Sequence, residues 1–78
     1  MRTGKNFRSH LAYVCKTERG YLSDLEDKVG TDTLAQFESV GFITKGHTLK
    51  NETWRKTNLA DSYFKEMFGW WAFLRLKR

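Results

Sequence analysis

The spacing of hydrophobic residues changes from a helical to a strand-like period after Gly41, and this change constrains the fold more than any other feature. Before Gly41, apolar side chains recur at intervals typical of amphipathic helices. Residues 42–44 and 53–56 are instead β-branched and aromatic around a polar stretch, which predicts a β-hairpin. Helical spacing returns at Asn58 and is followed to Phe68. The order of these segments predicts an α+β fold.

The first two helices have recognisable end signals. Asn6 is a good N-cap for the first helix, which should end near residues 19–20. Ser23 and Glu26 match a capping box, in which each side chain satisfies a free backbone N–H at a helix start. They predict a short second helix that stops at Gly30.

A third short helix and the turn of the hairpin follow. Thr31 is expected to cap this helix and Gly41 to end it. Gly46 and Asn51 supply residues that favour turns between the two strands. Asn58 is expected to open the last helix.

The length of 78 residues allows one domain, expected over residues 6–78 and preceded by a basic tail at residues 1–5. Cys15 is the only cysteine, so no disulfide can form within the chain. The start has no signal-like apolar segment, and the apolar run at residues 70–74 is too short to span a bilayer. These features predict a cytoplasmic protein.

Charge is distributed unevenly along the chain. Residues 1–17 contain four basic residues and no acidic one, whereas residues 18–38 contain six acidic residues and two basic ones. Residues 39–78 contain eight basic residues and three acidic ones. The net charge of +5 favours a polyanionic partner, which would have to avoid the acidic middle segment.

Three segments in this order resemble a winged helix-turn-helix domain. Residues 21–23 (Tyr-Leu-Ser) are similar to its short first strand, and residues 37–43 to the exit from its recognition helix into the wing. Residues 54–60 are similar to the segment that closes the wing, although Lys56 stands where the family prefers Leu and Ala60 where it prefers Gly. The resemblance implies a three-helix core, a β-hairpin wing and an additional C-terminal helix, in a regulator-like protein that binds duplex DNA.

The hairpin carries the residues expected to contact phosphates. The candidates are Lys45, Lys50, Arg55 and Lys56, and the alternative is a solvated hairpin whose charges prevent edge-to-edge aggregation. Residues 32–40, which would form the recognition helix, contain two acidic residues and no Lys or Arg.

Only Thr33 and Gln36 are therefore expected as base readers. The rival hypothesis is a protein-interaction module that keeps this scaffold without reading DNA.

The C-terminal segment contains half of the aromatic residues of the chain within residues 63–73. We expect Tyr63, Met67 and Trp70 to face the core. Phe64, Phe68 and Trp71 would then form an exposed face for a partner, with homodimerisation through the C-terminal helix as the leading case.

Two alternatives for this segment remain. The tail could fold back over the first helix and complete the core, or it could bind a membrane surface, the weakest of the three.

No arrangement of residues predicts catalysis or metal binding. His10 and His47 are isolated from other ligands at metal-binding spacing, and Cys15 lies on an apolar helix face as a small core residue. Trp54 is likewise expected in the core rather than as a stacking platform. We expect a protein that is not an enzyme, with no cofactor and no small-molecule substrate.

Overall fold

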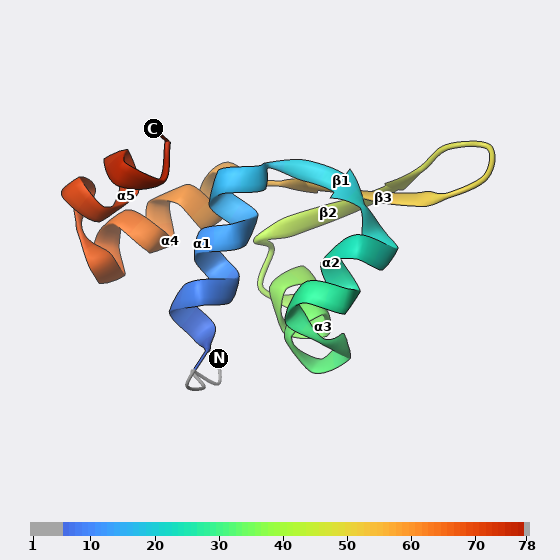
Figure 1. Cartoon of the computed structure of the whole chain (residues 1–78), viewed down its shortest axis with the longest axis horizontal. Helices are drawn as coiled ribbons and strands as arrows, with labels where there is room; N and C mark the ends of the chain where they lie inside the picture. Colours follow the sequence, from blue (N-terminus) through green and yellow to red (C-terminus); the bar gives the residue numbers. More distant parts are fainter. Residues whose placement is uncertain (1–5, 78) are drawn as a thin grey trace.

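The computed structural model describes residues 6–77, and within them the chain forms five helices and three strands. The predicted α+β fold is confirmed (Figure 1). In chain order the elements are α1 (Phe7–Thr17), β1 (Arg19–Tyr21), α2 (Leu22–Val29), α3 (Thr31–Ser39), β2 (Ile43–His47), β3 (Glu52–Lys56), α4 (Asn58–Phe68) and α5 (Trp70–Leu76).

The three strands form one antiparallel sheet in the order β1-β3-β2. Trp54 of β3 points toward the helices and is buried, whereas its neighbour Arg55 points to the opposite, outer face and is exposed. Helices α2 and α3 lie along the inner face of the sheet, and the hairpin of β2 and β3 extends beyond them (Figure 1).

The hairpin strands reach further into the polar segment than predicted. A four-residue turn connects them, in which the Thr48 N–H donates to the Asn51 carbonyl over 2.8 Å. The Thr48 hydroxyl also accepts from the Asn51 N–H. Gly46 lies within β2 opposite Thr53, so its expected role in the turn was wrong.

The core joins one face of every helix to the inner face of the sheet. Phe7 and Phe37 meet edge to face, with ring centroids 6.1 Å apart. Cys15 and Trp54 are buried, which confirms both as core residues. The buried residues are Phe7, Leu11, Val14, Cys15, Leu22, Leu25, Val29, Leu34, Phe37, Phe42, Ile43, Trp54, Ala60, Phe64 and Phe73.

The aromatic face of the C-terminal segment differs from the prediction. Phe64 is only 1% exposed and belongs to the core, whereas Met67 and Trp70 are exposed. Gly69 ends α4, so a stripe counted straight through it does not follow one continuous helix. The next helix, α5, folds back beside α4 (Figure 1). The ring centroids of Phe73 and Phe64 lie 6.3 Å apart. The fold-back alternative therefore describes this segment.

Single glycines connect two pairs of helices. Gly30 between α2 and α3 has φ 88° and ψ 159°, and Gly69 between α4 and α5 has φ 93° and ψ 158°. These left-handed values are strained for any residue with a side chain.

The predicted side-chain caps are absent at the four helix starts concerned. Helix α2 begins at Leu22, so Ser23 lies inside it rather than before it. Asn6 stands at the predicted N-cap without a capping bond, Gly30 replaces Thr31, and Thr57 replaces Asn58. The Thr57 hydroxyl instead donates to the Gly41 carbonyl, 2.5 Å away, which ties α4 to the end of α3. Every helix in the described part of the chain is too short or too polar to cross a bilayer.

Candidate nucleic-acid interface

Two arginines lie directly opposite each other on the outer face of the sheet. Arg19 of β1 pairs with Arg55 of β3, and Thr44 of β2 pairs with Arg55 from the other side. Directly opposed residues in antiparallel strands share a face, and all three are exposed. The next row on the same face contains Tyr21 and Thr53, since side chains alternate along each strand.

The two guanidinium groups carry like charges and repel each other. Among residues 6–77, neither Arg19 nor Arg55 forms an ion pair. Like charges placed directly opposite each other destabilise a strand pair. An anion bound between the two guanidinium groups would remove that cost.

Two open hollows adjoin the arginine pair. One, of about 360 Å³, is lined by the pair with Glu18 and Lys56. The other, of about 410 Å³, is lined by the pair with Gly20, Tyr21, Thr53 and Trp54. Both are shallow and open to solvent, so an extended ligand could lie across the pair.

Two of the predicted phosphate contacts lie on the helix side of the sheet instead. Lys45 is opposite Trp54, and its ammonium lies 3.0 Å from the Glu38 carboxylate of α3. A hydrogen bond to Glu38 and the charge of that carboxylate raise the pKa of Lys45. Lys56 is paired with Asp61 and Glu18, and its side chain is only 12% exposed. These pairings leave little of Lys56 open to a phosphate, and its phosphate contact stays a prediction.

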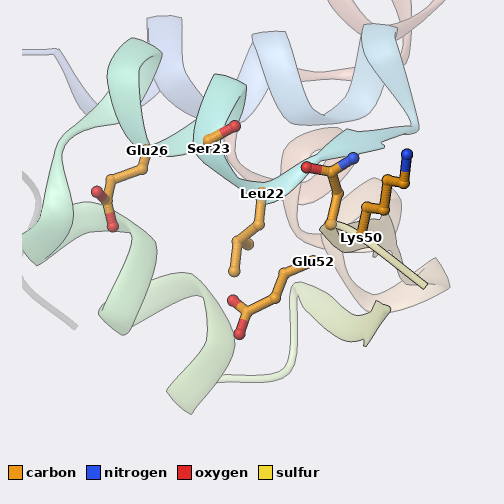
Figure 2. A pocket seen from close by; sticks show the side chains of 6 residues that line it. Leu22, Ser23, Glu26, Lys50 and Glu52 are labelled. Atoms are coloured by element: carbon orange, nitrogen blue, oxygen red, sulfur yellow. The ribbon is translucent and has the colours of Figure 1, made fainter. Parts of the chain in front are cut away.

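Lys50 occupies the turn of the hairpin and borders a hollow between the hairpin and α2. That hollow, of about 300 Å³, is lined by Leu22, Ser23, Glu26, Lys50, Asn51 and Glu52. The Lys50 ammonium points away from the carboxylates of Glu26 and Glu52 (Figure 2). Those two carboxylates would repel a phosphate on the α2 side, so Lys50 is open to an anion from the other side.

The exposed surface of α3 is not basic. Thr33 and Gln36 are half-buried, while Asp32 and Glu38 are exposed. Base reading by Thr33 and Gln36 stays a prediction, and the acidic residues around them would oppose a phosphate backbone.

A charged cluster beneath the sheet edge involves the only cysteine. Glu18 lies 3.9 Å from the Lys56 ammonium and 3.5 Å from that of Lys77, which also donates to the Cys15 carbonyl over 2.7 Å. Burial, and next the charge of Asp61, raise the pKa of the Cys15 thiol to about 12. At neutral pH this thiol is protonated and unreactive.

The C-terminal helix leaves a second surface uncovered. Trp70 is 62% and Trp71 is 78% exposed, and Met67 and Leu74 beside them are also exposed. The Lys65 ammonium lies 4.1 Å from the centre of the Trp70 ring, a cation–π contact. We call Met67, Trp70, Trp71 and Leu74 the α5 patch. Of the three residues predicted for an interface, Trp71 belongs to it, Phe68 is half-buried and Phe64 is buried.

Arg19 is the residue of this surface that the sequence prediction missed. It was placed at the end of the first helix, and its only signal was its alternation with Tyr21 around Gly20. Arg2 and Lys5 of the predicted basic tail lie outside the described residues.

Within residues 6–77, no three His, Cys, Asp or Glu side chains are grouped closely enough to hold a metal ion. Comparisons with protein-family models, curated proteins and solved structures found no match to this chain.

Proposed function

We propose that this chain is a small nucleic-acid-binding domain that contacts the phosphate backbone through the outer face of its sheet. The supporting observation is the opposition of Arg19 and Arg55, two unpaired arginines in register on an open face. Lys50 at the hairpin turn adds a cation that likewise forms no ion pair with the described residues. Arginine is well suited to this role because its planar guanidinium can hold two phosphate oxygens.

We further propose that the domain is a variant of the winged helix. The order of helices with a hairpin between α3 and α4 is compatible with that family. The acidic surface of α3 argues that binding depends on the hairpin and sheet rather than on a helix in the major groove. The proposed role is binding without catalysis, in a regulator-like protein.

The test is fluorescence anisotropy with a labelled random-sequence duplex DNA at several salt concentrations. We expect affinity to fall steeply with salt, since each neutralised phosphate contributes about −0.9 to the slope of log K against log salt. The double variant R19A/R55A should weaken binding to all sequences and flatten that slope by about 2.

A matched control removes two positive charges elsewhere. Arg8 and Lys28 are exposed on α1 and α2, so R8A/K28A lowers the net charge equally and leaves the sheet intact. Equal losses in the two double variants would mean that only net charge matters. No binding of the parent at low salt would refute nucleic-acid binding.

A second proposed role is self-association through the α5 patch. It is favoured by two adjacent, mostly exposed tryptophans, Trp70 and Trp71, because each aromatic side chain can bury about 150–250 Å². Sedimentation of the parent and of Trp71→Glu tests it, with Leu49→Glu at the exposed hairpin turn as the control. A dimer lost only in Trp71→Glu is expected, and a monomeric parent would refute self-association.

A further inference from the structure

We infer that Tyr21, Arg19 and Arg55 together form a site for an unpaired nucleotide, with the base stacked on the tyrosine ring and phosphates held by the two arginines. This inference rests on the proposed nucleic-acid binding and names the form of nucleic acid that the site would prefer.

The position of Tyr21 supports this arrangement. Tyr21 ends β1, is 51% exposed and lies on the same outer face as Arg19 and Arg55. Alternation along β1 separates Tyr21 from Arg19 by about 6.6 Å, and the neighbouring strand that carries Arg55 is about 5 Å away. The aromatic ring and both cations therefore occupy an area the size of one or two nucleotides.

Strand β1, which carries Arg19 and Tyr21, packs closely on the buried Trp54. Gly20, between Arg19 and Tyr21, lies opposite the buried Trp54, and a Cβ atom at Gly20 would come within 3.3 Å of the indole Nε1. Glycine thus allows β1 to lie close over the indole while its outer face remains free. The hollow of about 410 Å³ is open to solvent, and Tyr21 and the two arginines are among the residues that line it.

An unpaired base fits this surface better than a duplex does. In a duplex the faces of the bases are covered by their neighbours, whereas a single strand can place a base on an exposed aromatic ring. Stacking of this kind tolerates any base, and a positively charged surface follows the backbone. The positions opposed to Tyr21 on the outer face are Thr53 and then Gly46, neither of which carries a negative charge that would repel a phosphate.

The experiment compares labelled oligothymidine of about 12 nucleotides with a duplex of the same length. Binding is measured by anisotropy for the parent, Tyr21→Leu and Tyr21→Phe. Tyr21→Leu keeps an apolar side chain but removes the aromatic ring, while Tyr21→Phe retains the ring and is the matched control. We expect Tyr21→Leu to lose single-strand affinity about tenfold, with duplex affinity changed little and Tyr21→Phe like the parent.

The outcomes separate this inference from the function on which it rests. If parent and Tyr21→Leu bind the single strand equally while R19A/R55A binds weakly, the stacking site is refuted and backbone binding stands. If Tyr21→Leu weakens duplex and single-strand binding by the same factor, a preference for an unpaired base is refuted. If the parent binds neither oligonucleotide at low salt, both the inference and the proposed function fail. Thermal unfolding of each variant verifies that the fold is retained.

Discussion

Truncation of Phe64 tests the packing of the C-terminal helices directly. Phe64 is 1% exposed, and its ring centre lies 4.9 Å from that of Phe68 and 6.3 Å from that of Phe73. Removing a buried phenylalanine side chain costs about 3–5 kcal/mol of unfolding free energy. A domain of 78 residues has about 4–12 kcal/mol in total, so Phe64→Ala should remove a large part of it. Trp71→Ala, by contrast, truncates a side chain that is 78% exposed and should change stability by about 0.5 kcal/mol or less.

Urea unfolding followed by far-ultraviolet circular dichroism measures both effects without relying on tryptophan fluorescence. The midpoint for Phe64→Ala should fall by at least about 1 M, given the usual denaturant dependence of small domains. If this variant is unfolded in water, Phe64→Leu gives a smaller loss in the same direction. A greater loss for Trp71→Ala than for Phe64→Ala would refute the assignment of the buried face.

Three further substitutions test the ion pair of Lys56 and Asp61, the thiol of Cys15 and the single-residue connection at Gly69. Lys56→Met should cost about 1–3 kcal/mol because it leaves the half-buried Asp61 carboxylate without its cation. Asp61→Asn added to Lys56→Met should recover part of the loss in urea unfolding. The free energy of unfolding should decline as pH rises from 9 toward about 12, since the thiol of Cys15 ionises near 9.0 in the unfolded chain and near 12 in the folded one. Cys15→Ala should remove up to about 1.4 kcal/mol per pH unit of that decline. Equal slopes of unfolding free energy against pH for the parent and Cys15→Ala would contradict this. Gly69→Ala should cost about 1–3 kcal/mol through backbone strain alone, because the added Cβ would meet no atom of the described residues within 4 Å. D-alanine introduced there by chemical synthesis should avoid the loss, and equal melting temperatures for the two forms would count against strain.

Local patterns in the sequence predicted most segments of the fold, but not the separate helix α5 after Gly69. The apolar stripe from Phe7 to Cys15 predicted α1, and the change of period after Gly41 predicted the hairpin. The helix starts were less predictable because a capping residue in sequence does not become a cap unless its neighbours take the right backbone angles. Ser23 illustrates this, since β1 ends at Tyr21 and the helix begins immediately after it.

The candidate site required strand register, which the sequence alone did not supply. Alternation in β3 puts Arg55 on the outer face and Lys56 on the inner face, and only the pairing of β1 with β3 brings Arg19 opposite Arg55. Lys56 and Asp61 are five residues apart and meet because β3 is followed closely by α4. The face of Phe64 was wrong because α4 buries Ala60 and Phe64, whereas Met67 of the predicted stripe is exposed.

The single-residue connections between helices at Gly30 and Gly69 should tolerate insertions much less well than the hairpin turn does. An inserted residue at either connection would turn the following helix away from the core, since no spare chain is present to absorb it. The turn at residues 48–51 is exposed and lies away from the core, where longer loops cost little entropy. Among relatives of this chain, variation in length should therefore collect at the hairpin, and the same turn is the place to graft an epitope or a reporter.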